Sequence, residues 1–204
     1  MSAAGPSQGA KAPSGGSAAH EVASVGVGGM GGRHVVVMGV AGCGKSVVGE
    51  GIARELGLPL IEGDDFHPPR NIQKMQQGIA LTDEDRADWL QTLRHRLASC
   101  TGGAVLTCSA LKAAYRDILR TAVPEVYFVH LVISQAESLR RVAGRGAGHF
   151  YPPSLVASQF EALQDPAGER HVLVLDAARP LASLAPQAVQ WLWSQRGLEK
   201  DSEI

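Results

Sequence analysis

The stretch GVAGCGKS, residues 39–46, decides how this chain folds. It follows the apolar run His34–Met38 and precedes the periodic segment Lys45–Leu56, so it joins a predicted strand to a predicted helix. The pattern G-x-x-x-x-G-K-[ST] in this context is a phosphate-binding loop, because its glycines let successive backbone N–H groups point at phosphate oxygens. The start of the following helix adds the positive end of its dipole. The residues expected to bind a nucleoside triphosphate are Gly39, Val40, Ala41, Gly42, Cys43, Gly44, Lys45, Ser46 and Val47.

Two side chains of this loop carry its chemistry. Lys45 supplies a positive charge for the β- and γ-phosphates of ATP, and the Ser46 hydroxyl can bind Mg²⁺. The loop alone leaves a small-molecule kinase, a GTPase switch and an ATP-driven mechanical protein open. The guanine tetrad N-K-x-D and the transporter motif L-S-G-G-Q do not occur in the sequence. Val172–Asp176 looks like a Walker B strand, but its place as the last apolar run favours a plain core strand.

Outward from the loop, short apolar runs alternate with longer periodic segments. The other predicted strands are Leu58–Glu62, Ala104–Cys108, Val126–Val132 and His171–Leu175. The predicted helices are Lys45–Leu56, Asp83–Ala98, Leu111–Thr121, Gln135–Val142, Pro153–Leu163 and Leu181–Gln195, with a further helix after the acidic segment described below. Thr82 is the expected N-cap of the helix that begins at Asp83. Five strands alternating with helices predict an α/β fold with a five-stranded parallel sheet covered on both sides.

The composition of the chain indicates where the folded domain begins and in which compartment the protein acts. The first 32 of 204 residues hold nine Gly, seven Ala, five Ser and two Pro, so we expect a disordered tail over 1–32, a folded domain over 33–196 and a flexible end over 197–204. The net charge of −1 gives no footprint for nucleic acid, and no apolar run reaches the roughly 18 residues of a membrane span. Three unevenly spaced cysteines indicate free thiols in a reducing compartment, so we expect a cytoplasmic protein.

An acidic segment follows the second predicted strand. It reads Glu62-Gly63-Asp64-Asp65-Phe66-His67, and parallel strands bring their carboxyl ends to one crevice, so it should face the phosphate loop. One carboxylate there can accept a proton from an attacking hydroxyl, for which Asp64 is the candidate. Another can help to hold magnesium, for which Glu62 is the candidate beside Ser46. The alternative is a solvated acidic turn.

Four longer stretches carry a resemblance to a known family. GDDFHPPRNIQKM (63–75), LTDEDRADWLQTL (81–93), CSALKAAYRDILR (108–120) and GHFYPPSLVASQFEALQDP (148–166) resemble the gluconokinases, small P-loop kinases built like adenylate and shikimate kinases. The resemblance implies ATP- and Mg²⁺-dependent phosphorylation of D-gluconate at its 6-hydroxyl. It also implies a product that enters the pentose phosphate pathway, and a homodimer. A sibling kinase for shikimate or a nucleoside monophosphate, and a non-catalytic nucleotide-binding regulator, are the alternatives.

The residues make chemical sense of a sugar-acid substrate. Gluconate carries hydroxyls and a carboxylate, so its site needs cations and hydrogen-bonding groups, and Arg is suited to bidentate capture of a carboxylate. Lys112 and Arg116 are four residues apart and should share one helix face. Any single basic residue could instead be a solvated surface charge. The candidate substrate-binding residues are Asp64, His67, Arg70, Asn71, Lys74, Arg86, Ser109, Lys112 and Arg116, and the candidate catalytic residues are Lys45, Asp64 and Arg145.

Two further expectations concern the lid and one thiol. Arg141 and Arg145 precede the glycine-rich segment 146–148, so we expect a lid over about 140–153 that places both arginines on ATP and excludes water. An ordinary basic helix C-terminus is the alternative. Cys43 lies within the phosphate loop beside Lys45, where the thiol pKa is lowered in general. A tolerated small residue is the simpler interpretation, and a thiol whose oxidation or alkylation blocks ATP binding is the sharper hypothesis.

Overall fold

A computed structural model describes residues 32–144 and 151–200, and the side chains as far as residue 195. All but Gly32 of the expected N-terminal tail therefore lies outside the described residues, as do Arg145 and the glycine-rich part of the expected lid. The last helix extends to Lys200, so residues 197–200 of the expected flexible end are helical. Within the described part of the chain, no helix is long and apolar enough to cross a membrane.

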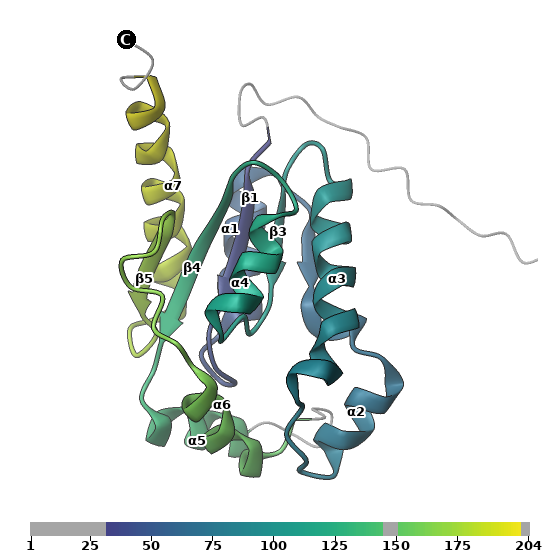
Figure 1. Cartoon of the computed structure of the whole chain (residues 1–204). Coiled ribbons are helices and arrows are strands. Elements are labelled where there is room, and N and C mark those ends of the chain that lie inside the picture. The colour runs from purple at the N-terminus through teal and green to yellow at the C-terminus, as the bar shows by residue number, and fades with distance from the viewer. Residues whose placement is uncertain (1–31, 145–150, 201–204) are drawn as a thin grey trace, which may run out of the picture.

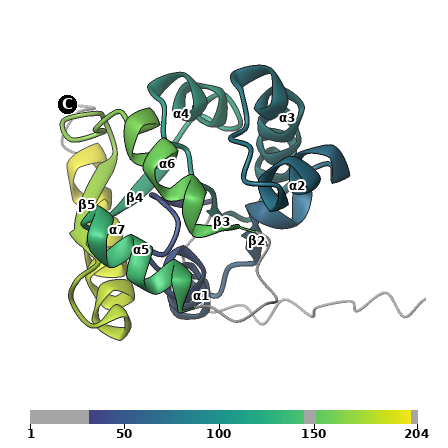
Figure 2. The same cartoon turned by 90° about the horizontal axis from the view of Figure 1, so that it is seen from below.

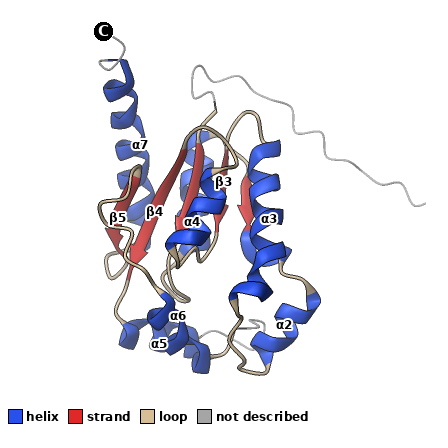
Figure 3. Ribbon diagram, viewed as in Figure 1, coloured by secondary structure: helices blue, strands red, loops and turns tan. Residues whose placement is uncertain are grey.

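The sheet has five parallel strands in the order β2-β3-β1-β4-β5 (Figures 1 and 3). The strands are β1 (His34–Met38), β2 (Leu60–Glu62), β3 (Ala104–Thr107), β4 (Val126–Val132) and β5 (Val172–Asp176). β1 is the central strand, with β3 and β2 on one side of it and β4 and β5 on the other. Ligands of such sheets bind beyond the carboxyl ends of the strands, where the strand order reverses, which here is the end of β1. The predicted parallel α/β fold is confirmed.

Helices cover both faces of the sheet and its carboxyl end. The α-helices are α1 (Lys45–Leu56), α2 (Pro69–Gln76), α3 (Asp83–Ser99), α4 (Ala113–Arg120), α5 (Gln135–Ala143), α6 (Val156–Ala162) and α7 (Leu184–Lys200). Short 3₁₀ turns occupy Gly63–Phe66, Pro153–Leu155 and Leu181–Ser183. Figure 1 shows α2, α5 and α6 below the sheet, at the end where the strands finish, and Figure 2 shows this end from below. These three elements therefore surround the predicted site.

Several predicted boundaries shift for identifiable reasons. β2 begins at Leu60, after Pro59, which has no N–H to donate to the ladder. The helix predicted from Leu111 begins at Ala113, because Ala110 has a positive φ of 43° and Lys112 is extended. The helices predicted from Pro153 and Leu181 each open with a 3₁₀ turn. Thr82 caps α3 as expected and forms a capping box with Asp85.

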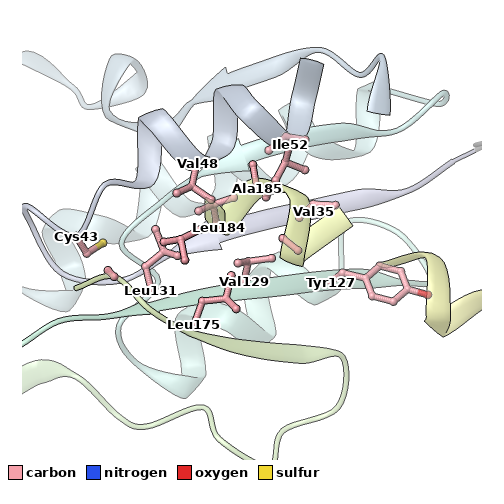
Figure 4. Close-up of a cluster of buried hydrophobic side chains, with 14 of the residues drawn as sticks. Val35, Cys43, Val48, Ile52, Tyr127, Val129, Leu131, Leu175, Leu184 and Ala185 are labelled. Atoms are coloured by element: carbon pink, nitrogen blue, oxygen red, sulfur yellow. The ribbon is translucent and has the colours of Figure 1, made fainter. Parts of the chain in front are cut away.

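The core has two halves, one on each face of the sheet. Val35, Val37 and Val129 point toward α1 and α7, where the half shown in Figure 4 lies. Val36 and Phe128 point the other way, toward α3 and α4. Alternate residues of one strand thus enter opposite halves, and both halves are apolar. This is why the strands appear in the sequence as continuous apolar runs.

Candidate active site at the carboxyl ends of the strands

The phosphate loop has the backbone that its glycines predict. Gly39, Gly42 and Gly44 have φ angles of 137°, 77° and 98°, which L side chains rarely adopt. A Cβ on Gly39 would lie 2.7 Å from the carbonyl oxygen of Leu131 in β4. Glycine is therefore required at this position both for conformation and for the close approach of two strands.

Lys45 and Ser46 leave the loop on the side where β2 and β3 end. The Lys45 ammonium donates hydrogen bonds to the carbonyl oxygens of Gly39 and Val40, each 3.1 Å away, and so lies across the loop. The Ser46 hydroxyl donates to Glu62 Oε2 at 3.2 Å, and the same oxygen accepts a hydrogen bond from Thr107. The predicted pairing of Ser46 with Glu62 is thus present, and it gathers three oxygen-bearing side chains beside Lys45.

A pocket opens between the phosphate loop, the acidic turn after β2, α3 and α6. Six of the predicted site residues lie together in its wall: Ala41, Lys45, Asp64, His67, Arg86 and Ser109. The rest of the wall consists of Met75, Leu81, Tyr151 and Gln159. Asp64 is exposed at the mouth of this pocket, in the 3₁₀ turn that follows β2. A carboxylate, two cations and hydroxyl groups therefore face one space, which suits a polar, anionic ligand.

His67 is held in its neutral form within this pocket. Its ring stacks on Trp89 with centroids 4.2 Å apart, and Trp89 is itself anchored by a 2.8 Å hydrogen bond to the Gly63 carbonyl. Burial lowers the pKa of His67 to about 4; Asp64 opposes the shift and Arg86 adds to it. Among the described residues, its buried Nδ1 has no hydrogen-bond partner. A neutral imidazole can both donate to and accept from a ligand hydroxyl.

Two neighbouring groups of the pocket stay protonated. Burial raises the pKa of the Tyr151 hydroxyl, which donates to the Leu155 carbonyl at 2.8 Å. Burial likewise raises the pKa of the Cys108 thiol, next to Ser109, to about 12. Neither group therefore adds negative charge near the pocket.

Three predicted substrate-binding residues lie on α2 and do not reach the pocket wall. Arg70 is exposed and pairs with Asp88 at 2.9 Å, whereas Lys74 pairs with Asp85 at 2.7 Å. Asn71 is fully buried and donates to the Asp85 carbonyl at 2.7 Å. These contacts join α2 to α3, so the structure gives the three side chains a role in holding the helix beside the pocket.

The expected shared face of Lys112 and Arg116 is not observed. Lys112 precedes α4, pairs with Asp83 at 2.6 Å and lines a shallow hollow that adjoins the pocket at Leu81 and Arg86. Arg116 has no exposed surface. Its guanidinium donates to the Glu169 carboxylate and, at 3.0 Å each, to the carbonyls of residues 110 and 111. The substrate-binding expectation for Arg116 is corrected: it clamps the loop that carries Ser109.

A second hollow lies on the other side of the phosphate loop. Its wall consists of Gly42, Gly44, Val47, Arg141, Ala178, Arg179, Pro180 and Leu181. Arg141 is oriented by Glu137 and by the Ala177 carbonyl, at 2.7 and 2.9 Å, and within the described residues its buried Nη1 has no partner. The predicted placement of Arg141 beside the loop is therefore observed, but that of Arg145 lies outside the described residues. The phosphate loop thus lies between two hollows.

Cys43 does not face either hollow. Its side chain has no exposed surface and lies in the core half between the sheet and α1, as Figure 4 shows. The hypothesis of a reagent-accessible thiol at the phosphates is therefore wrong, because the loop turns this side chain inward.

Besides Tyr151 and the apolar wall residues, sequence reasoning missed two residues of this region. Gln159 lines the pocket and accepts a hydrogen bond from the Ala41 N–H at 2.6 Å. Arg179 lies in the second hollow, three residues beyond the end of β5. The rule that ligands bind beyond strand ends could have found Arg179. Gln159 had no such local signal, since its position depends on how α6 packs.

Comparisons with known proteins agree with this geometry. A family model described as shikimate kinase matches residues 41–178. The thermosensitive gluconokinase of Escherichia coli is 42% identical over 165 residues, covering 79% of this chain and 88% of that protein. The gluconokinase of Gluconobacter oxydans is 45% identical over 69% of this chain and 80% of that protein. A crystal structure of a gluconokinase from Sinorhizobium meliloti superposes with a TM-score of 0.76 at 46% identity, covering 83% of this chain and 97% of that one.

Proposed function

The chain belongs to the gluconokinase family of small P-loop kinases, and on that premise we propose how it converts ATP and D-gluconate into ADP and 6-phospho-D-gluconate. The single observation that carries the proposal is that Lys45 of the phosphate loop and Asp64 of the acidic turn line one pocket. The phosphoryl donor and the hydroxyl acceptor can therefore meet at a place where one group neutralises charge and another takes up a proton.

The nucleotide occupies the side of the loop that faces α5 and the end of β5. The loop amides and the start of α1 hold the phosphates, and Arg141 and Arg179 add positive charge in the adjoining hollow. Lys45 is released from the carbonyls of Gly39 and Val40 to bind the β- and γ-phosphates. Arg145 keeps the ATP-binding and catalytic role that its motif predicts, within a lid that closes over the phosphates.

The oxygen groups beside the loop fit a magnesium ion. Ser46 and Glu62 would hold it, since a hydroxyl and a carboxylate are ligands that Mg²⁺ accepts. Mg²⁺ usually keeps several waters and is completed by substrate phosphate oxygens, so two protein ligands suffice. When bound, the ion neutralises charge that develops on the transferred phosphoryl group.

The acceptor enters the pocket on the other side of the loop. Arg86 binds the carboxylate of gluconate, because it lines this pocket and, among the described residues, has no carboxylate partner of its own. His67 and Ser109 hydrogen-bond to hydroxyl groups of the sugar acid. Asp64 accepts the proton of the 6-hydroxyl while the oxygen of that hydroxyl forms a bond to the γ-phosphorus. At the same time the bond between the γ-phosphorus and the bridging oxygen breaks, and that oxygen leaves with ADP. The contribution of such a base is about 10²–10⁴-fold in rate.

The remaining substrate-binding candidates act from outside the pocket wall. Lys112 lies in the hollow that adjoins the pocket, whereas Arg70, Asn71 and Lys74 hold α2 against α3. By family resemblance we further infer that the protein is a homodimer and acts in the cytoplasm. We infer in the same way that its product enters the pentose phosphate pathway. Binding of nucleic acid or of a membrane forms no part of this proposal.

The test is phosphoryl transfer from ATP to a panel of acceptors. Purified protein with MgATP should phosphorylate D-gluconate and give a product identical to 6-phospho-D-gluconate by NMR, and chelation of magnesium should abolish turnover. Shikimate and nucleoside monophosphates should be poor acceptors. Transfer to one of these in preference to gluconate would indicate a sibling kinase. Nucleotide binding without transfer to any acceptor would indicate a regulator.

A further inference from the structure

The amide of Gln159 touches both halves of the site. It lies on α6, is only 9% exposed, and lines the acceptor pocket together with Lys45, Asp64 and Arg86. Its Oε1 accepts the hydrogen bond of the Ala41 N–H at 2.6 Å. A side chain that follows Ala41 by 118 positions in the sequence thus fixes a peptide group of the phosphate loop.

The direction of this amide follows from chemistry. A backbone N–H can only donate, so the group facing Ala41 must be the carbonyl oxygen of Gln159, and the NH₂ group must lie on the opposite side. Among the described residues no hydrogen-bond partner is found for that nitrogen, and it is not sealed from solvent. Two N–H donors are therefore available at a pocket wall.

The backbone of Ala41 is held at its carbonyl group as well. Ser138 of α5, which has no exposed surface, donates from its hydroxyl to the Ala41 carbonyl at 2.8 Å. The N–H and the carbonyl group of Ala41, which belong to two successive peptide groups, are therefore each bound by a side chain. Gln159, whose NH₂ group has no partner among the described residues, lines a space whose other polar groups suit a sugar acid.

We propose that Gln159 is a substrate-binding residue of the acceptor site, whose NH₂ group donates to an oxygen of the sugar acid while its carbonyl oxygen holds the phosphate loop in register. This inference rests on the proposed function and adds a specificity contact to the same site. The two roles fall on two different atoms, so substitutions can separate them.

The key variant is Gln159→Glu. A carboxylate keeps the length of the side chain and an oxygen acceptor for Ala41, but it replaces the donor with a negative charge facing an anionic substrate. We expect the KM for gluconate to rise at least about tenfold, the effect of losing one charge-assisted hydrogen bond. Binding of ATP to the protein without gluconate, measured by calorimetry, should change less than about threefold. In Gln159→Met, which loses both atoms, ATP binding should weaken as well.

Gln164→Glu is the matched control. The Gln164 Oε1 also accepts a backbone hydrogen bond, from Ala113 at 2.7 Å, but its side chain is exposed and does not line the pocket. This variant should keep the wild-type KM for gluconate. Thermal unfolding of all three variants checks that each is folded.

The outcomes separate this inference from the proposed function. If the wild type phosphorylates gluconate and Gln159→Glu keeps its KM within twofold, Gln159 does not bind the acceptor and the inference fails alone. An equal rise in Gln164→Glu would also overturn it, because the effect would then be a general one of charge. If the wild type does not phosphorylate gluconate, the proposed function fails and the inference falls with it.

Discussion

Replacement of Arg116 by Met tests whether this residue stabilises the fold or binds substrate. Arg116 has no exposed surface, and its guanidinium bonds to the Glu169 carboxylate and to the carbonyls of Ala110 and Leu111. Met fills much of the volume but donates nothing. The Ala110 carbonyl then loses the donor that the structure provides, whereas Leu111 keeps the N–H of Gln164 at 2.9 Å.

The expected cost can be worked from these contacts. One buried carbonyl left without a donor costs about 1–3 kcal/mol, and breaking a buried ion pair costs about 3–5 kcal/mol. Glu169 still pairs with Arg120 at 2.6 Å and is itself 25% exposed, so the cost of breaking the ion pair lies at the lower end of its range. The costs of the ion pair and of the carbonyl also overlap, because one guanidinium makes both contacts. We expect a loss of about 3–5 kcal/mol in the free energy of unfolding. For a chain of this size, that lowers the melting temperature by roughly 6–20 °C.

Thermal and urea unfolding measure this loss, and gluconate kinetics below the transition measure the function. Arg170→Met is the control: its pair with Glu125 is exposed and 3.5 Å long, so its loss should cost less than about 1 kcal/mol. The double variant Arg116→Met/Glu169→Leu should lose less than the sum of the single variants. A folded Arg116→Met protein of wild-type stability with a strongly raised KM for gluconate would refute the clamp and restore a substrate role.

Two other predictions follow from the pocket. Asp64→Asn should bind ATP normally but turn over about 10²–10⁴-fold more slowly, as single-turnover kinetics would show, and near-wild-type turnover would remove Asp64 as the base. His67 has a pKa of about 4 in the folded protein against about 6.5 when unfolded, so the unfolded chain binds more protons between these values and stability falls as pH falls from 6.5 toward 4. The melting temperature of His67→Gln should therefore drop less than that of the wild type between pH 7 and pH 5; an equal drop would contradict a buried neutral imidazole.

Much of the fold was predictable because its signals are local. The glycines of residues 39–46 require positive φ, and each buried strand leaves an apolar run in the sequence. The capping box at Thr82 follows from residues three positions apart. The sequence also allowed three pocket residues to be predicted, namely Asp64, His67 and Ser109. Each follows the end of a strand, and parallel strands end at the same edge of the sheet.

The α/β class, the phosphate loop and the strand ends that carry the candidate site thus follow from local sequence signals. Which cations face the pocket depends on tertiary packing, because Arg86 and Arg116 are both helix arginines and differ in what packs against them. Tertiary packing also turns Cys43 into the core and brings Gln159 to Ala41 across 118 positions. Backbone preferences and hydrophobic periodicity act over a few residues, whereas burial and hydrogen-bond partners depend on segments far apart in the chain.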